Sequence, residues 1–289
     1  EPEEIFFTSG ATEANNTAIK GVARFYRKHR NHLVTAVSEH MCVLDSCFQL
    51  EKEGFDVTYL QVGSDGLLDL EELKAALTDQ TILVSIMSVQ NEIGTIQPMA
   101  KIGAICRERK VFLHTDAAQA VGKIPIDVKQ MKIDLLSLTA HKIFGPMGIG
   151  ALYVGKKPRV RLEPIFSGGG QEKGLRSGTL APALCVGLGE ALRIADEEML
   201  GDAARLGALR DQMWQRLNGA VPGLVLNGSM TNRIGVNLNF SVDGADAESL
   251  MAALPGLAVS SGSACSSASD DSSHVLKAIG LSNALAEAS

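Results

Sequence analysis

Cys265 is the residue of this sequence whose surroundings most favour chemistry. It lies in a run of serine, glycine and alanine at 260–269, where almost every neighbour is small. Free cysteine usually behaves as a small buried hydrophobe. A thiol among serine, glycine and alanine is therefore more typical of a reactive or mobile group. The same composition also fits a surface turn that happens to carry a cysteine. The rest of the chain must decide between these two interpretations.

Four further groups of reactive side chains each follow an apolar run that predicts a strand. They are the run Thr-Ser-Gly-Ala-Thr-Glu at 8–13, His40, Asp116 with Gln119, and His141 with Lys142. Each group alone also fits a structural role such as a helix cap. Ligands of open α/β sheets bind at the carboxyl ends of the strands, so we expect these groups to lie together.

This combination of groups is what pyridoxal 5′-phosphate (PLP) requires. Its aldehyde forms a Schiff base with a lysine, its ring nitrogen needs a carboxylate, and its phosphate needs N–H and hydroxyl donors. Small residues before a helix supply such N–H donors to phosphate. We therefore predict that Lys142 binds the aldehyde, Asp116 the ring nitrogen and the turn at 10–12 the phosphate. His40 is a candidate to stack on the ring.

An alternation of strands and helices over residues 5–155 provides the elements that must position these groups. Short apolar runs predict strands at 5–7, 33–37, 57–60, 81–86, 111–114, 134–138 and 150–154. Helical patterns occur at 14–30, between the strand at 33–37 and Glu53, at 70–77 and at 99–109. Strands separated by helices indicate βαβ units, so we predict an α/β fold with a mostly parallel sheet flanked by helices.

The C-terminal part of the chain departs from this alternation. A long helical pattern at 181–217 precedes an alternating, strand-like pattern at 235–242 and a helical pattern at 246–254. The segment with Cys265 follows. The changed order of elements predicts a second, smaller α+β domain, and we divide the chain into residues 1–199 and 200–289.

The composition excludes several classes of protein. The 289 residues are 45% hydrophobic and 21% charged, with a formal net charge of −6, as in soluble globular domains. No lysine- or arginine-rich run stands out, so nucleic acid is not an expected partner. No apolar stretch reaches the length of about 18 residues that a transmembrane helix needs, so no membrane association is expected.

The five cysteines do not form a disulfide or metal pattern. They stand at positions 42, 47, 106, 185 and 265, without a CxxC pair. We expect neither a disulfide scaffold nor a bound metal, and a reducing compartment fits this usage best.

Six runs of the sequence resemble the cysteine desulfurases of the class V aminotransferases, in particular the branch for iron–sulfur cluster assembly and nitrogen fixation. They are Thr-Ser-Gly-Ala-Thr-Glu at 8–13, Gln-Asn-Glu-Ile-Gly at 90–94, Asp-Ala-Ala-Gln at 116–119, His-Lys-Ile-Phe-Gly-Pro at 141–146, Arg-Ser-Gly-Thr at 176–179 and Ser-Ser-Gly-Ser-Ala-Cys at 260–265. The resemblance implies the fold type I of PLP-dependent transferases. It also implies PLP as cofactor, L-cysteine as substrate, a homodimer, and transfer of sulfur to an acceptor or iron–sulfur scaffold protein.

The resemblance implies a role for each matching residue. Lys142 would bind the aldehyde, His40 would stack on the ring, and Cys265 would take the substrate sulfur as a persulfide. Either Lys142 or His40 would move the α-proton. The resemblance places in the cofactor site Ala11, Thr12, Asn91, Asp116, Gln119, Thr139, His141 and, from the neighbouring subunit, Thr179.

The sequence departs from the family pattern at a few positions. Thr139 stands where serine is usual and keeps the hydroxyl, Gln90 stands where asparagine is usual, and 270–273 replace a Leu-Glu-Pro-Ser type of run. The chain opens without methionine and lacks the family's N-terminal segment. It also lacks the C-terminal strand that brings an arginine for the substrate carboxylate. We therefore expect this sequence to be a piece of a longer protein.

Two alternative functions stay open at this point. Another PLP enzyme of the same fold, such as a selenocysteine lyase or an aminotransferase, would not need Cys265. A catalytically silent scaffold in cluster assembly would use the fold only to dock partners. A thiol oxidoreductase is disfavoured because no resolving cysteine stands near Cys265. We expect the protein in the cytoplasm, or in the mitochondrial matrix if it is eukaryotic.

Overall fold

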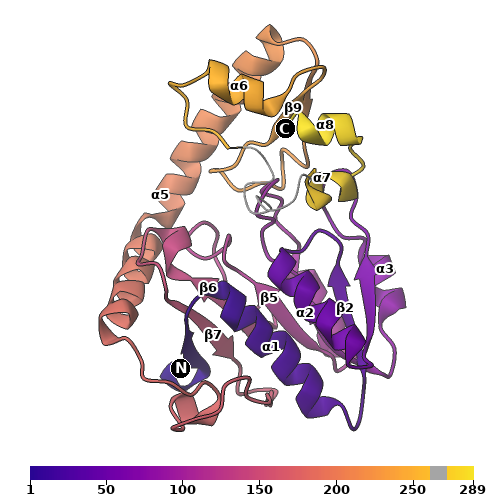
Figure 1. Cartoon of the computed structure of the whole chain (residues 1–289), viewed down its shortest axis with the longest axis vertical. Helices are drawn as coiled ribbons and strands as arrows, with labels where there is room; N and C mark the ends of the chain where they lie inside the picture. Colours follow the sequence, from indigo (N-terminus) through magenta and orange to yellow (C-terminus); the bar gives the residue numbers. More distant parts are fainter. Residues whose placement is uncertain (261–271) are drawn as a thin grey trace.

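A seven-stranded sheet forms the centre of the larger part of the molecule (Figure 1), a computed structural model that describes residues 1–260 and 272–289. The strands, in chain order, are β1 (Ile5–Thr8), β2 (His32–Ala36), β3 (Asp56–Leu60), β4 (Thr81–Ser85), β5 (Phe112–Asp116), β6 (Leu135–Thr139) and β7 (Gly150–Val154). Their order across the sheet is β1-β7-β6-β5-β4-β2-β3. Cys265 lies outside the described residues.

The sheet is mostly parallel, as predicted. The pairs from β3 through β2, β4 and β5 to β6 are parallel, and only β7 runs antiparallel to its neighbours β6 and β1. All five residues are buried in each of β2, β4 and β6. Such continuously buried strands require cover on both faces of the sheet.

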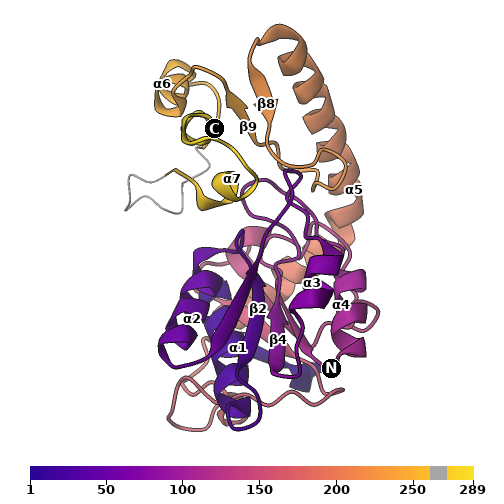
Figure 2. The ribbon, with the colours of Figure 1, turned by 90° about the vertical axis from the view of Figure 1, so that its right-hand side faces the viewer.

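Helices supply this cover on both faces (Figure 2). They are α1 (Ala11–Tyr26), α2 (Met41–Lys52), α3 (Leu70–Ala76), α4 (Met99–Glu108) and α5 (Pro182–Ala220), with the short 3-10 helices η1 (Pro2–Glu4), η2 (Ala140–Ile143) and η3 (Glu172–Gly174). Side chains of α1 and α2 belong to one hydrophobic cluster with the sheet, and those of α3, α4 and the start of α5 to another. The two helix layers hold the strands in place, and the predicted site residues lie at or just after the ends of these strands.

The segment at 235–242 is the one place where the predicted secondary structure is largely wrong. Only its last residues form a strand, β9 (Phe240–Val242), which pairs with the unpredicted strand β8 (Leu224–Leu226). The side chains of Asn237 and Asn239 donate instead to the Glu92 carbonyl, at 2.8 and 3.4 Å. The alternating pattern therefore reflects packing against the loop after β4 rather than strand pairing.

The C-terminal elements complete a smaller part of the molecule. They are α6 (Ala247–Ala253) and two short helices absent from the prediction, α7 (His274–Ala278) and α8 (Asn283–Glu287). Ser273 and Ser282 cap the last two by accepting backbone N–H groups, a start signal that the sequence does contain. The proposed domain boundary at residue 200 falls inside the unbroken helix α5, so the division at 199/200 stays a proposal.

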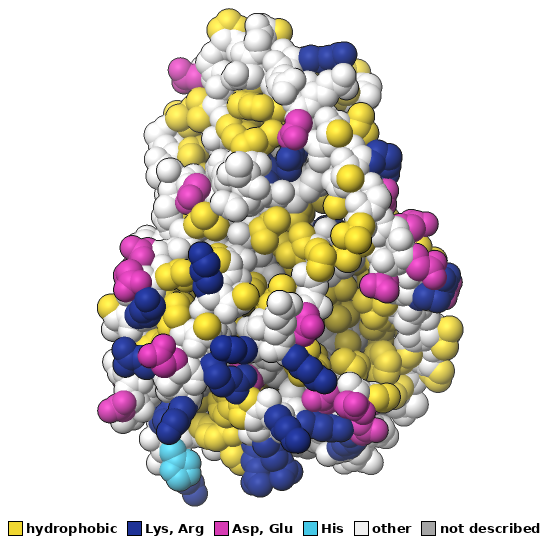
Figure 3. Space-filling model, turned by 180° about the vertical axis from the view of Figure 1, so that it is seen from behind, with side chains coloured by type: hydrophobic (Ala, Val, Ile, Leu, Met, Phe, Trp, Pro, Cys, Tyr) yellow, Lys and Arg dark blue, Asp and Glu magenta, His cyan; other side chains and the backbone are white. Residues whose placement is uncertain are grey.

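Figure 3 shows the face opposite to Figure 1, where hydrophobic side chains gather in the middle and lysine and arginine side chains lie mainly along the lower part. Within residues 1–260 and 272–289, no helix combines the length and the apolar character needed to cross a membrane.

A buried histidine in the sheet predicts a loss of stability in acid. His114 on β5 is 0% exposed, and its ring nitrogens lie 2.8 Å from Ser85 Oγ and 3.0 Å from Ser137 Oγ. Burial lowers its pKa from 6.5 to about 3. The unfolded chain therefore binds this proton more readily, so stability falls as the pH falls through this window. Between pH 6.5 and pH 5 the expected loss is about 2 kcal/mol.

This expectation is checked by urea unfolding of the wild type and of His114→Gln at several pH values between 7 and 5. The variant is less stable at neutral pH because it disturbs both serine contacts, but its stability should fall less steeply with acid. Equal slopes for the two proteins would show that His114 does not carry the acid sensitivity.

Candidate active site

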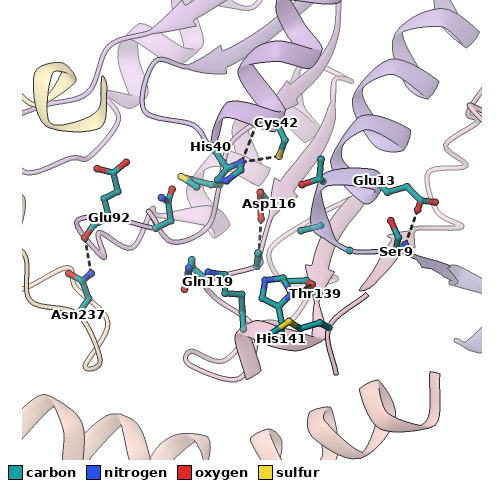
Figure 4. A pocket seen from close by; sticks show the side chains of 18 of the residues that line it. Ser9, Glu13, His40, Cys42, Glu92, Asp116, Gln119, Thr139, His141 and Asn237 are labelled. Carbon is teal, nitrogen blue, oxygen red and sulfur yellow. Dashed lines mark hydrogen bonds between the residues drawn. The ribbon is translucent and has the colours of Figure 1, made fainter. Parts of the chain in front are cut away.

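A cavity of about 630 Å³ opens at the carboxyl ends of the strands, and it contains most of the predicted site. Figure 4 shows these side chains converging from separate loops. The predicted site residues that line the cavity are Ala11, Thr12, His40, Asn91, Asp116, Gln119, Thr139, His141 and Lys142. The sheet thus brings together groups that lie up to 131 positions apart in the chain, Ala11 and Lys142 being the most distant pair.

Two predicted site residues are not among those that line this cavity. Thr179 is exposed, and its role toward a neighbouring subunit stays a prediction. Arg176, in the same motif, donates from Nε to Glu13 Oε1 at 2.7 Å and thereby ties this segment to the start of α1. Cys265 lies outside the described residues, whereas Ser260, five positions before it, does line the cavity.

The start of α1 offers backbone donors to an anion. Its N-cap, Gly10, has no side chain to bind the first N–H groups of the helix, and the Glu13 carboxylate accepts from Ser9 N at 2.8 Å. The chain passes very close to β7 here, because a Cβ on Gly150 would lie 2.7 Å from Gly10 Cα. The open N–H groups and the helix dipole together favour a phosphate.

Thr139 and His141 form a second group of polar side chains beside this turn. Thr139 Oγ1 lies 2.9 Å from His141 Nδ1 and 3.3 Å from the Ile149 carbonyl oxygen. A serine hydroxyl would allow the same contacts, so the departure at position 139 keeps the chemistry of the site.

Asp116, at the end of β5, is a buried carboxylate that forms no salt bridge with a described side chain. Its oxygens accept from Ala118 N at 2.9 Å and from Asn15 Nδ2 at 2.6 Å. Burial raises the pKa of Asp116, while these two hydrogen bonds and the nearby His40 act in the opposite direction. A buried carboxylate at a cavity wall fits a cationic ring nitrogen, which would favour the ionised form of the carboxyl group.

Asn15 is a site residue that the sequence argument missed. It is 0% exposed although it is polar, and it occupies the same helical face as Ala14, Ala18 and Ile19. A polar residue within an apolar helical stripe was the signal that could have found it. Its contact with Asp116 gives it a positioning role.

Lys142 supplies the predicted amine of the cavity. A second lysine, Lys123, contacts the lining residue Gln119. Lys123 Nζ lies 2.5 Å from Gln119 Oε1 and is not among the lining residues. Burial, together with the charge of Lys142, lowers the pKa of Lys123 to about 8. Because Lys123 engages the Gln119 oxygen, the amide nitrogen of Gln119 is left to donate toward the cavity, as a phenolic oxygen of PLP would require.

The turn at 90–94 explains the unusual glutamine at its start. Gln90 Oε1 accepts from the backbone of Glu92 at 2.5 Å and of Ile93 at 2.9 Å. Its Nε2 donates to Asn91 Oδ1 at 3.3 Å. Gln90 therefore closes the turn and orients Asn91, whose own amide nitrogen remains available for a ligand.

Glu92 joins the same turn to the C-terminal part of the chain. Its Oε2 accepts from Ser273 Oγ at 2.5 Å, and its carbonyl accepts from Asn237, as Figure 4 shows. In the turn between β2 and α2, the Glu39 carbonyl oxygen lies 2.9 Å from His274 Nε2. The segment that follows Cys265 in the sequence is thus attached to the rim of the cavity.

These features define a PLP-binding member of a large enzyme class, and comparison with known families agrees. The family model described as "Aminotransferase class-V" matches residues 1–285. The chain belongs to the class-V aminotransferase family, whose members use PLP, and the residues around the cavity fit that cofactor.

Curated relatives place the chain within one group of this family, the cysteine desulfurases. It is 58% identical over 289 residues to "Cysteine desulfurase IscS" of Histophilus somni (strain 2336), covering all of this chain and 71% of that protein. It is 55% identical over 289 residues to "Probable cysteine desulfurase, mitochondrial" of Dictyostelium discoideum, covering all of this chain and 64% of that protein.

Solved structures support the same fold assignment. A "NIFS-LIKE PROTEIN" matches with a TM-score of 0.91 at 35% identity, over all of this chain and 76% of that one. A structure titled "SspA in complex with cysteine" matches with a TM-score of 0.85 at 40% identity, over all of this chain and 80% of that one. The predicted fold type I of PLP-dependent transferases is confirmed.

Proposed function

We propose that this chain removes sulfur from L-cysteine, releases L-alanine and holds the sulfur as a persulfide on Cys265. One observation carries this proposal. In a chain of the cysteine desulfurase family, a single cavity combines a lysine, a buried carboxylate, an imidazole and a phosphate-binding turn. Membership in this family also disfavours the alternatives of a selenocysteine lyase, an aminotransferase and a silent scaffold.

The residues around the cavity are suited to hold PLP in one orientation. The start of α1, with Ala11 and Thr12, would bind the phosphate together with Thr139 and His141. Asp116 would bind the ring nitrogen. The remaining proposed contacts are His40 on the ring face, Asn91 and Gln119 at its edge, Lys142 at the aldehyde, and Thr179 from a second subunit. When bound, PLP stabilises negative charge at the α-carbon of an amino acid.

The chain's own groups then move the proton and take the sulfur. Lys142 and His40 both line the cavity and are the candidates to hold the α-proton. The Cys265 thiolate forms an S–S bond with the substrate sulfur while the carbon–sulfur bond breaks. The carbon keeps the bonding electron pair, and a proton completes L-alanine.

The other cysteines are poorly suited to accept sulfur. Burial raises the pKa of Cys42, Cys47 and Cys106 to about 12, and it also raises the pKa of Cys185. The thiolate is the nucleophile, so a raised pKa disfavours this role. Cys265 follows the cavity-lining Ser260 by five residues in the sequence, which supports its assignment as the sulfur acceptor.

A homodimer is part of the proposal. Next to Lys142, Phe144 is 103% exposed and Met147 is 84% exposed, and on α5 Val186 is 72% exposed. Met147 lines the cavity, and large exposed apolar side chains like these three support cover by another protein surface. A second copy of the chain would cover them and would bring Thr179 to the phosphate.

The sulfur would pass from Cys265 to an acceptor or iron–sulfur scaffold protein, in the cytoplasm or the mitochondrial matrix. Support comes from relatives whose names include bacterial IscS proteins and a mitochondrial protein.

The proposed function is tested by incubating the PLP-loaded protein with L-cysteine. We expect L-alanine to form, and sulfide to appear only after a thiol reductant releases it from the protein. Formation of pyruvate or a keto acid instead of alanine would assign the chain to another reaction of this fold.

Thr139 provides a prediction about cofactor affinity. Replacing it with valine removes the hydroxyl that lies 2.9 Å from His141 Nδ1 and that we place at the phosphate. Loss of a hydrogen bond to a charged group is expected to weaken PLP binding about 10-fold or more. Thr139→Ser, which keeps the hydroxyl, should bind PLP like the wild type. The dissociation constant from fluorescence titration checks this, and equal affinity of Thr139→Val and wild type would remove Thr139 from the site.

A further inference from the structure

We infer that Cys42 is a positioning residue that holds the neutral ring of His40 in one tautomer, with its proton on Nε2. His40 then presents a hydrogen-bond donor to the cavity and has no free basic nitrogen there. Of the two candidates to remove the α-proton, this leaves Lys142. The tautomer of His40 does not depend on the proposed function, whereas the assignment of the α-proton to Lys142 rests on it.

The first observation is the way in which α2 begins. His40 is the N-cap of this helix, with φ −62° and ψ 145°, and its Nδ1 accepts a hydrogen bond from Cys42 N at 3.1 Å. A backbone N–H can only donate, so Nδ1 must present its lone pair. A proton on Nδ1 would set two N–H groups against each other and leave a helix N-terminal amide without its acceptor.

The second observation is the thiol of the same residue. Cys42 Sγ lies 3.1 Å from His40 Nδ1. Burial raises the pKa of this thiol to about 12, so it keeps its proton and has an S–H to donate. Both groups of Cys42 that contact Nδ1, the amide and the thiol, are therefore donors. Figure 4 shows the contact between His40 and Cys42.

The third observation connects this pair to Asp116. The Asn15 amide nitrogen donates to Cys42 Sγ at 3.2 Å and to Asp116 Oδ2 at 2.6 Å. An amide nitrogen carries two hydrogens, so both bonds can form at once. The buried side chain of Asn15 thus holds both the Cys42 thiol, which contacts His40, and the Asp116 carboxylate, which we place at the ring nitrogen.

These contacts limit what His40 can do. Within the part of the chain that the structure describes, its Nε2 has no hydrogen-bond partner, and His40 lines the cavity. A neutral imidazole carries one proton, so when Nδ1 accepts, Nε2 donates. Nε2 can take up a proton only in the other tautomer, which the contacts of Cys42 oppose.

The tautomer is measured directly by nitrogen NMR of the protein labelled with ¹⁵N-histidine, with His40→Gln to assign the signals. At a pH where the ring is neutral, we expect the Nδ1 signal of an unprotonated nitrogen and the Nε2 signal of a protonated one. A protonated Nδ1, or averaged signals for the two nitrogens, would overturn the inference. Because the measurement needs no turnover, it can succeed or fail independently of the proposed desulfurase activity.

Substitutions at position 42 test whether this residue is responsible. Cys42→Ser keeps both donors and should give the wild-type signals. Cys42→Pro removes both, so the two ring nitrogens should move toward the averaged shifts of a tautomer mixture. If this variant does not fold, Cys42→Ala, which removes only the thiol, should show a smaller change in the same direction. Wild-type signals in the folded proline variant, or in the alanine variant that replaces it, would overturn the role of Cys42.

Discussion

Replacing Lys142 with alanine is expected to lower L-alanine formation from L-cysteine on the order of 1,000-fold. Lys142 lies on η2, directly after β6, and it contributes the predicted amine to the cavity. The substitution removes both the proposed attachment of PLP and the group that we infer to move the α-proton. Steady-state assays of alanine in the PLP-loaded variant and wild type measure the effect.

A control substitution at another lysine and reduction with borohydride make this test specific. Lys101→Ala removes an exposed lysine of α4 that does not line the cavity, and it should leave the rate unchanged. Reduction of the PLP-loaded wild type with borohydride should fix the cofactor on the peptide that contains Lys142. Attachment to Lys123, whose pKa is lowered to about 8, would contradict the assignment.

Replacing Cys265 with serine is expected to abolish the protein-bound persulfide and to lower alanine formation on the order of 100-fold or more. A hydroxyl keeps the size of the side chain but is a much weaker nucleophile toward sulfur than a thiolate. Cofactor binding should not change, because the groups that we assign to PLP lie elsewhere. Alanine formation, together with the amount of sulfide that a reductant releases from the protein, measures both effects.

Cys185→Ser is the control for this substitution. Cys185 is a partly exposed free cysteine at the start of α5 and does not line the cavity. Its replacement should leave both the rate and the persulfide at wild-type values. Loss of persulfide in Cys185→Ser, with persulfide retained in Cys265→Ser, would reverse the assignment.

Most strands and helices of the seven-stranded sheet and its two helix layers could be predicted, because the strands are buried on both faces. Such strands, like β4, carry short apolar runs, and each is followed by a loop whose polar residues reach one sheet edge. His40, Asp116 and Lys142 were therefore predictable as neighbours although they are far apart in the chain. The six motifs then supplied their expected roles.

The contacts that position these groups could not be predicted in the same way. Gln90 closes its turn through its own side chain, and His40 caps a helix, a position where serine, threonine, aspartate and asparagine are usual. The segment at 235–242 alternates like a strand but bonds to Glu92. Each of these depends on a specific partner that local pattern does not encode.

The most direct test of the account is to locate the sulfur after a single turnover. The PLP-loaded protein is mixed with one equivalent of L-cysteine, quenched with an alkylating reagent, digested and analysed by mass spectrometry. We predict one released L-alanine per added sulfur atom, with that atom on the peptide that contains Cys265. Sulfur on a peptide that contains Cys42 or Cys185, or alanine without protein-bound sulfur, would contradict the account.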